Sequence, residues 1–450
     1  MMNLIDNDIK FVGRNIMKYY CIGIKGSGMS TLAGLLYDLG NEVSGYDDSK
    51  EHKFTEEGLI RRGIPIYYEA HDMDPDTIVT FSRAFREDHK EIVRVRELGL
   101  TIKNYNEVIG DITKMFDTVG VSGTHGKTTT SLLISHIIDN TIGCNYFVGD
   151  GTSHAAKENN IFVIESDEYN KHFLAYHPSI AIITNIELDH VECYNGLEDI
   201  INTFKTFGNK SNLVVACGDD KNVRKIEFDK KVIYYGFNDN NDVVAKNVEL
   251  TKEGSSFDVY MNGEFYHHFE LPLFGRHMIL NALASIIVCN NYGISKEKIH
   301  DYMKDFKGAK RRFREEVIGD IVTIDDYAHH PTEIKVTLEA ARQKYPDKEI
   351  VAIFLPNTYS RTEALMDEFV DVLKMADKAY IMDIHCDRER SIDYPGVSSD
   401  TLIERVPNSE KVSLDDADKL LKHHNSVMCF MSCTNIYVLL DKYKELLKKQ

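Results

Sequence analysis

The chain has 450 residues, of which 43% are apolar and 28% charged, so it has enough apolar material to bury several hydrophobic cores. At about 150 residues per domain, this length predicts three domains. The formal net charge of −18 argues against non-specific nucleic-acid binding, and no apolar run approaches the roughly 18 residues of a membrane-spanning helix. The first ten residues, MMNLIDNDIK, lack the features of a signal peptide, so we expect a cytoplasmic protein.

Cysteines and basic residues narrow the kinds of site to expect. The closest cysteine pair, Cys429 and Cys433, has the spacing C-x3-C, which argues against a structural zinc site. A basic cluster, KGAKRRFR at 307–314, places five cationic side chains in eight residues. Such a cluster can be a solvated surface, but its interleaved glycine, alanine and phenylalanine favour a linker packed near an anionic ligand.

The first predicted unit alternates strands and helices. A strand at 18–24 leads through a glycine-rich turn to a helix at 29–39, which Gly40 ends, and then to a strand at 42–47. A strand–helix–strand unit of this kind forms a parallel sheet. Further strand–helix pairs continue to about residue 110, and we expect residues 111–114 to form a connector.

Two further α/β units follow, separated by a linker at 306–312. The second is predicted to contain strand 116–121, helix 127–138, strands 161–165 and 179–185, a β-rich segment at 231–271 with a hairpin turn at Asn262-Gly263, and helix 278–290. The third is predicted to contain strand 321–327, a helix from Pro331, strand 349–356, helix 362–374, strand 379–384 and helix 434–447. The fold class is therefore α/β with three domains, predicted at 1–112, 113–309 and 310–450.

The segment SGTHGKTTT at 122–130 predicts a phosphate-binding loop. Its glycines are spaced differently from the common G-x-x-x-x-G-K-[ST] pattern, since Val121 stands at the first glycine position. A strand followed by a glycine turn and a helix directs backbone N–H groups toward one point, where an anion is stabilised. Lys127 can neutralise phosphate charge and the Thr128 hydroxyl can reach Mg²⁺. The sequence therefore predicts a nucleoside triphosphate site.

Acidic and imidazole side chains end the next two strands of the same unit. Glu165 is placed to hold Mg²⁺, directly or through water, and Glu168 is placed to orient a substrate amine or ligand. His190 is either a ligand of a second ion or a loop residue, and the spacing alone favours the loop residue.

A second glycine-rich turn, GIKGSGMS at 23–30, permutes the dinucleotide pattern G-x-G-x-x-G. Asp47, at the end of the next strand, stands where a ribose-binding carboxylate would lie. This pattern fits a nicotinamide dehydrogenase, and it fits equally a turn that only packs the helix closely.

Taken together, five segments identify the chain as similar to the Mur ligases of peptidoglycan synthesis. They are GTHGKTTT, ESDEYNKHFL, TNIELDH, KRRF and DDYAHHPTEI. GDGTSH at 149–154 and NTYSRT at 357–362 extend the resemblance over nearly the whole chain, in the same order. The resemblance implies a Rossmann-like UDP-binding domain, a central P-loop ATPase domain and a C-terminal Rossmann-like domain that closes over the nucleotide. It also implies that ATP drives the joining of L-alanine to UDP-N-acetylmuramate through an acyl phosphate.

The resemblance further implies roles for individual residues. Lys127, Glu168, His190, Arg312 and His330 would be catalytic, and Thr128, Glu165 and His190 would hold Mg²⁺. The ATP-binding residues would be Gly123, Thr124, His125, Gly126, Lys127, Thr128, Thr129, Asn281, Arg312 and Asp326. The substrate-binding residues would be Gly26, Ser27, Gly28, Asp47, Tyr327, His330 and Arg361. The UDP substrate would then replace the redox cofactor at the first glycine turn.

Three positions depart from the family pattern. Asn357 replaces a histidine expected to touch substrate, Met278 replaces an asparagine on the adenine side, and S-C-T-N at 432–435 replaces G-A-G-D. Asn357 and S-C-T-N keep open one alternative, a nucleotide-binding homologue with reduced or no catalysis. A separate alternative is a sister ligase that adds a peptide to the same sugar nucleotide. We expect a monomer or homodimer.

Overall fold

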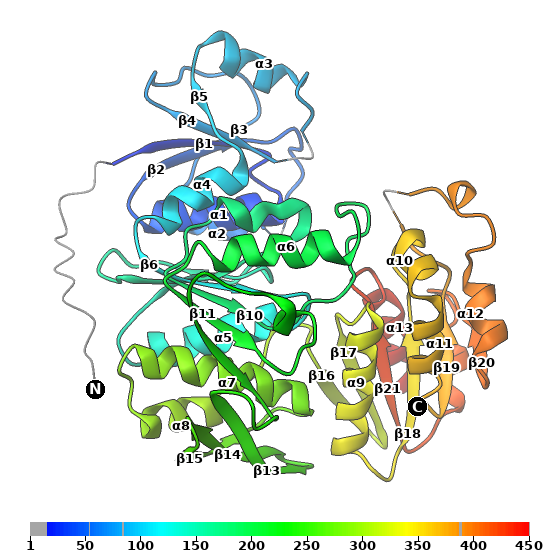
Figure 1. Ribbon diagram of the computed structural model, residues 1–450. Coiled ribbons are helices and arrows are strands. Elements are labelled where there is room, and N and C mark those ends of the chain that lie inside the picture. The colour runs from blue at the N-terminus through cyan, green and yellow to red at the C-terminus, as the bar shows by residue number, and fades with distance from the viewer. Residues whose placement is uncertain (1–15, 54, 83–84, 387–388, 450) are drawn as a thin grey trace. The chain divides into compact units, whose positions relative to one another are not determined.

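The computed structural model describes residues 16–53, 55–82, 85–386 and 389–449; the segment considered above for a signal peptide, residues 1–10, lies outside this range. Contacts divide the chain into two compact units (Figure 1). One contains the described residues from 16 to 116 together with 144–162, and the other contains 117–143 and the described residues from 163 to 449. Within the described residues, no helix has the length and hydropathy needed to cross a bilayer.

The first unit contains a parallel sheet in the order β3-β2-β1-β4-β5. Its elements are β1 (Lys18–Ile22), α1 (Ser27–Asp38), β2 (Glu42–Tyr46), α2 (Glu56–Arg62), β3 (Ile66–Tyr67), β4 (Ile78–Phe81), α3 (Lys90–Glu97), β5 (Thr101–Ile102) and α4 (Tyr105–Thr113), with the hairpin β7 (Asn145–Phe147) and β8 (Ser153–His154). β1 pairs with β2 in parallel register, Cys21 opposite Gly45. The predicted strand–helix–strand start of the chain is confirmed.

The connector predicted at 111–114 is wrong for its first three residues, which form the last turn of α4. A capping box between Asn104 and Glu107 starts this helix. Val108, Ile109 and Ile112 then bury one face of it, so the helical period continues through Asp111 into the expected connector.

In the second unit, the first sheet runs in the order β15-β14-β13-β12-β11-β10-β6-β9. Its strands are β6 (Asp117–Ser122), β9 (Ile161–Glu165), β10 (Ile180–Ile183), β11 (Leu213–Cys217), β12 (Lys231–Gly236), β13 (Val243–Thr251), β14 (Gly254–Met261) and β15 (Glu264–Leu271), and its helices are α5 (Lys127–Asp139), α6 (Leu197–Gly208), α7 (Arg276–Asn291) and α8 (Lys296–Lys304). The last three strands are antiparallel and include the predicted hairpin at Asn262-Gly263, where both residues have positive φ. β6 lies between β9 and β10, so their carboxyl ends share one edge.

The remaining sheet has the order β16-β17-β21-β18-β19-β20. It is formed by β16 (Arg314–Ile318), β17 (Ile321–Asp326), β18 (Glu349–Phe354), β19 (Lys378–Ile381), β20 (Ser409–Lys411) and β21 (Ser426–Met431), with helices α9 (Pro331–Lys344), α10 (Tyr359–Ala364), α11 (Met366–Leu373), α12 (Ser399–Arg405) and α13 (Tyr437–Leu447). The helix predicted at 362–374 is two helices, since Leu365 between them is non-helical (φ −121°, ψ 25°). The helix predicted from residue 434 begins only at Tyr437.

Candidate functional site

The predicted phosphate loop connects β6 to α5, and both of its glycines are required by their surroundings. Gly123 has a φ of 137°, and a Cβ atom there would overlap the Thr184 hydroxyl. Gly126 has a φ of 83°, and a Cβ atom there would lie 2.6 Å from Oδ1 of Asn281. α5 then begins at Lys127, so the loop presents a helix N-terminus with the dipole and free N–H groups that favour an anion.

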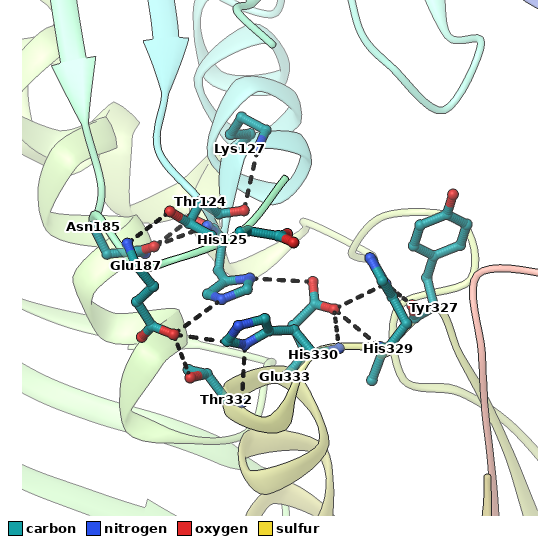
Figure 2. A network of polar contacts seen from close by, with 12 residues as sticks. Thr124, His125, Lys127, Asn185, Glu187, Tyr327, His329, His330, Thr332 and Glu333 are labelled. Atoms are coloured by element: carbon teal, nitrogen blue, oxygen red, sulfur yellow. Dashed lines mark hydrogen bonds and ion pairs between the residues drawn. The ribbon is translucent and has the colours of Figure 1, made fainter. Parts of the chain in front are cut away.

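The end of β10 fixes the loop backbone. The Thr124 N–H donates to the Asn185 carbonyl oxygen (3.0 Å) and the His125 N–H donates to Oδ1 of Asn185 (2.8 Å). The Thr184 hydroxyl donates to the His125 carbonyl oxygen at 2.6 Å. Thr184 and Asn185 directly follow β10, and their side chains hold the phosphate loop in place through these bonds, which Figure 2 draws in part.

Lys127 lies in a buried ion pair with Glu168. Its Nζ is 2.8 Å from Oε2 of Glu168, and it also donates to the carbonyl oxygens of Gly123 (2.6 Å) and Thr124 (3.1 Å). Burial works to lower the pKa of Lys127, but the carboxylates of Glu168 and Asp167 outweigh it and hold that pKa above its usual range. Lys127 is therefore a fixed positive charge at the start of α5.

The three residues predicted to hold metal fall into two adjacent groups. The Thr128 hydroxyl donates to Oε1 of Glu165 at 3.0 Å, which places two oxygen donors side by side. His190 lies instead with Asp167 and Glu168, and one donor atom from each of these three comes within 4.8 Å of the others. Glu168, expected from sequence to orient an amine, thus also lies where it can hold a cation.

A second polar cluster surrounds the His125 side chain (Figure 2). Its Nε2 is 3.4 Å from Oε2 of Glu187 and its Nδ1 is 3.4 Å from Oε1 of Glu333. Burial works to lower the pKa of His125, yet the two carboxylates prevail and raise it to about 9. Burial likewise opposes ionisation of Glu187, but the bond to His125 lowers its pKa to about 2. With its imidazole protonated, His125 forms an ion pair with each of the two carboxylates.

His330 belongs to the same cluster but stays neutral. Its ring lies 4.7 Å from the His125 ring, and burial together with the charge of His125 lowers its pKa to about 4. Its Nδ1 accepts the Thr332 N–H (3.3 Å), which caps α9. Glu333 completes this capping box by accepting the N–H groups of His329 (3.0 Å) and His330 (3.3 Å). His330 is therefore partly a structural cap.

A cavity of about 450 Å³ lies beside the loop. Thr129, His277 and Met278 line it from α5 and α7, while Asp326 and residues of α9 line it from the other side. Burial raises the pKa of Asp326 to about 6 against the opposing charge of Arg312. The basic cluster supplies most of the cations of the cavity: Lys307, Lys310, Arg312 and Arg314, joined by Lys344 of α9. This charge pattern suits a nucleotide, and it confirms that the cluster faces a cavity.

Arg361 and Asn357 lie at the carboxyl end of β18. The Arg361 guanidinium is 2.9 Å from Oδ1 of Asp189. Burial is the largest single influence on the pKa of Asp189 and works to raise it. The nearby positive charges, with Arg361 first among them, outweigh burial and hold that pKa far below its usual range. Arg361 also donates to the Asn357 carbonyl oxygen at 3.3 Å. The Asn357 side chain donates to the His385 carbonyl oxygen (3.2 Å). The charge predicted to bind substrate anions is thus already balanced by Asp189.

The structure also shows the contacts of two other residues that depart from the family pattern, Met278 and Ser432, and of the predicted substrate residue Tyr327. Met278 accepts a weak bond from Nδ2 of Asn281 through its sulfur, at 3.8 Å. Ser432 replaces the first family glycine; its hydroxyl donates to the Leu355 carbonyl oxygen at 3.0 Å, which fixes the turn after β21. Tyr327 is 37% exposed, and the Cζ atom of the Arg312 guanidinium lies over its ring, 5.3 Å from the ring centre of Tyr327.

The residues predicted for the UDP moiety lie together in the other unit. Gly26, Ser27 and Gly28 start α1 directly after β1. Asp47 follows β2 and is buried, and its Oδ2 accepts the Lys25 N–H at 3.1 Å. The glycine turn and the acidic residue thus come together as the pattern predicted.

Sequence reasoning missed Glu187, Asp189 and Glu333. Glu187 and Asp189 stand in the segment TNIELDH that drew attention to His190, and Glu333 stands in the segment that contains His330. The available signal was the H-P-T-E capping pattern before the apolar helix, which places a glutamate at the third position of α9.

Three Mur ligase descriptions match successive parts of the chain. They are "Mur ligase family, catalytic domain" at residues 18–117, "Mur ligase middle domain" at 121–289 and "Mur ligase, glutamate ligase domain" at 311–427. The chain belongs to the Mur ligase family. The resemblance stated from the motifs, and the α/β class with three sheets, are confirmed.

Within the Mur ligases, the chain is similar to several proteins named UDP-N-acetylmuramate–L-alanine ligase. The one from Lactiplantibacillus plantarum is 43% identical over 436 residues, covering 96% of this chain and 98% of the relative. The one from Limosilactobacillus reuteri is 42% identical, covering 96% and 99%. A crystal structure of UDP-N-acetylmuramate-alanine ligase MurC from Thermotoga maritima superposes with a TM-score of 0.77 at 28% identity, covering 96% and 99%. A murein peptide ligase from Psychrobacter arcticus shares the fold, with a TM-score of 0.65 at 21% identity.

Proposed function

We propose that this Mur ligase joins L-alanine to the lactyl carboxylate of UDP-N-acetylmuramate at the expense of ATP, the first amino-acid addition to the peptidoglycan stem. The observation that supports this most directly is the loop at 123–128, which presents a helix N-terminus and Lys127 beside a cationic cavity. The activity named for relatives 41–43% identical over nearly the whole chain agrees with it.

The reaction has two steps whose atoms balance. The substrate carboxylate oxygen attacks the γ-phosphorus of ATP, and the bond between the γ-phosphorus and the oxygen of the β-phosphate breaks. ADP is released and the substrate becomes an acyl phosphate. The neutral amine nitrogen of L-alanine then attacks the acyl carbon, the bond from that carbon to the phosphate oxygen breaks, and phosphate leaves. The nitrogen gives up one proton to water or phosphate and keeps one as the amide N–H. Because phosphoryl transfer needs mainly positioning and charge neutralisation, the side chains required are cations and hydrogen-bond donors.

The described residues supply those roles. Lys127, at the N-terminus of α5, would neutralise the charge on the transferred phosphoryl group. Arg312 faces the cavity from the linker and would bind the same phosphates or the acyl phosphate. Asp326 and Asn281 would contact ATP, and Tyr327 with His330 would lie at the amino-acid end. Gly26, Ser27, Gly28 and Asp47 would hold the UDP moiety.

Mg²⁺ fits the oxygen donors present. Thr128 and Glu165 would hold one ion, since their oxygens already lie 3.0 Å apart, and His190 with Glu168 would hold a second. Bound Mg²⁺ would supply positive charge to the phosphates and to the substrate carboxylate.

Three further proposals accompany this function. The domain division 1–112, 113–309 and 310–450 is supported by the finding that β1 to β5 lie in the first range, β6 and β9 to β15 in the second and β16 to β21 in the third. A cytoplasmic location accords with ATP as a substrate. A monomer or homodimer is the proposed state in solution.

The test is phosphate release from ATP and UDP-N-acetylmuramate, with and without L-alanine. We expect release that depends on L-alanine and on Mg²⁺. Release supported by an L-Ala-γ-D-Glu-meso-diaminopimelate tripeptide but not by L-alanine would establish the sister-ligase alternative. Nucleotide binding with only background release for every amino acid would establish a homologue without catalysis, and the proposal would fail.

A further inference from the structure

The histidine of the phosphate loop makes contacts that phosphate binding does not require. Its backbone is already fixed by Asn185, yet Figure 2 shows its imidazole directed toward Glu187, His330 and Glu333. The His125 side chain is 12% exposed, and each of its two nitrogens faces a different carboxylate at 3.4 Å. This part of the loop therefore faces α9, while Lys127 lies at the start of α5.

Both carboxylates are tied to α9. Oε2 of Glu187 accepts the Thr332 hydroxyl at 2.6 Å, and Thr332 lies in the first turn of that helix. Glu333 is itself a residue of α9 and also binds Arg312 of the linker at 3.2 Å. His125 thus joins the end of β10 and the start of α9 through two charged contacts made by one ring.

A protonated His125 supplies positive charge to both carboxylates of this cluster. Glu187 and Glu333 are negative, because His125, His329 and Arg312 hold their pKa values below the usual range against the effect of burial. His330 is neutral, so the groups that can carry positive charge opposite them are Arg312, His125 and His329, whose Nδ1 is 3.1 Å from Oε2 of Glu333. Without the His125 charge, a partly buried carboxylate would lose its partner beside a second carboxylate.

The same helix forms one wall of the nucleotide cavity. Val336, Thr337, Ala340 and Lys344 of α9 line the cavity, and Thr129 of α5 lines it from the opposite side. The spacing between α5 and α9 therefore determines the width available to a nucleotide. The contacts of His125 lie between the starts of these two helices.

We propose that His125 is a positioning residue: by bridging Glu187 and Glu333, it holds α9 at the distance from the phosphate loop at which a nucleotide binds. The inference rests on the nucleotide site proposed above. It does not depend on which amino acid is joined.

The pH dependence of binding supplies a second readout. The groups that face His125 are Glu187, Glu333 and His330, and His277 lies close enough to interact with its charge. Arg312 and His329 contact Glu333. Because the folded pKa of His125 is about 9, above the ordinary value of 6.5, its bridging charge is fully present at neutral pH and is lost as pH rises through about 9.

The experiment measures ADP binding by calorimetry for the full chain in Mg²⁺ buffer. We expect the parent to bind ADP more weakly above pH 9, and we expect His125→Gln to weaken ADP binding roughly tenfold at pH 7.5 and to show no further weakening above pH 9. His136→Gln is the matched control, since His136 lies on α5, the helix that follows the loop, and packs against Tyr302 and Phe306. It should bind ADP like the parent.

A double variant distinguishes a bridging charge from general damage. In His125→Gln/Glu187→Gln, the unpaired carboxylate is neutralised, so most of the lost affinity should return. Parent-like ADP binding by His125→Gln, or no recovery in the double variant, would overturn the proposal. If His125→Gln does not fold, Glu187→Gln alone serves as the test. It should weaken ADP binding about threefold, and parent-like ADP binding by this variant would overturn the proposal. Parent-like ADP binding by His125→Gln would count against this proposal only. Failure of the parent protein to release phosphate would count against the proposed ligase function only.

Discussion

Replacing Lys127 by alanine should remove turnover and also destabilise the protein. Lys127 and Glu168 form a buried ion pair at 2.8 Å, their side chains being 13% and 4% exposed. Removing one partner of a buried pair costs roughly 3–5 kcal/mol, because the other charge is left without compensation. We therefore expect the urea midpoint of Lys127→Ala to fall well below that of the parent at pH 8, while phosphate release drops to background.

The pH dependence of this loss follows from Glu168. Burial is the largest influence on the pKa of this carboxyl and raises it, and without Lys127 the pKa rises further. A carboxyl whose folded pKa lies above its unfolded value takes up a proton in the folded state as pH falls. The variant should therefore recover part of its stability at pH 5.5 relative to pH 8.

Lys127→Ala/Glu168→Gln separates the two roles of the lysine. With the carboxylate removed, most of the stability should return, because no unpaired charge is buried, but turnover should not. Urea unfolding at pH 5.5 and 8, together with the phosphate-release assay, measures both. Unchanged turnover in Lys127→Ala would refute the phosphate-loop assignment, and unchanged stability at pH 8 would refute the role given to the ion pair.

Three other substitutions test separate parts of the site. Gly123→Ala should abolish ADP binding measured by calorimetry, since the new Cβ overlaps the Thr184 hydroxyl and the backbone has a φ of 137°; parent-like affinity would show that the loop is not rigid. Arg361→Met should lower stability to urea by roughly 3–5 kcal/mol because it strands the buried carboxylate of Asp189, and a loss below about 1 kcal/mol would contradict this. Asn357→His should give equal or higher kcat/KM for L-alanine, as the family pattern has histidine there; a tenfold fall would show that the chain relies on a rearranged pocket.

The phosphate loop and the strand ends could be predicted because they are local in sequence. The glycines, Lys127 and Thr128 lie within six residues, and the rule that ligands collect at the carboxyl ends of parallel strands adds Glu165 and Asn185. The structure places the Thr128 hydroxyl against Glu165, as the metal hypothesis required.

The ion pairs that join distant segments could not be predicted in this way. Thr332 contacts Glu187 across 145 residues, and Arg361 contacts Asp189 across 172. Each of these residues has an ordinary local explanation, such as a helix cap or a loop acid, and only the packing of the two sheets brings them together. The same limit explains the missed break at Leu365, where the apolar pattern continues although the backbone leaves the helix.

The charge distribution gives a physical reason for a divalent cation at this site. Lys127 is balanced by Glu168, Arg361 by Asp189, and Arg312 with His125 by Glu333 with Glu187. Glu165, Asp167 and Asp326 add further carboxyl groups nearby. Among these residues the cations are therefore already matched by acids, and the chain as a whole carries a net charge of −18. The phosphates of ATP would add negative charge to a site that has no surplus of positive charge among these groups. One Mg²⁺ held by Thr128 and Glu165 and a second held by His190 and Glu168 would supply that positive charge. The carboxylates that would repel a nucleotide are thus the ones that would bind the ions it needs.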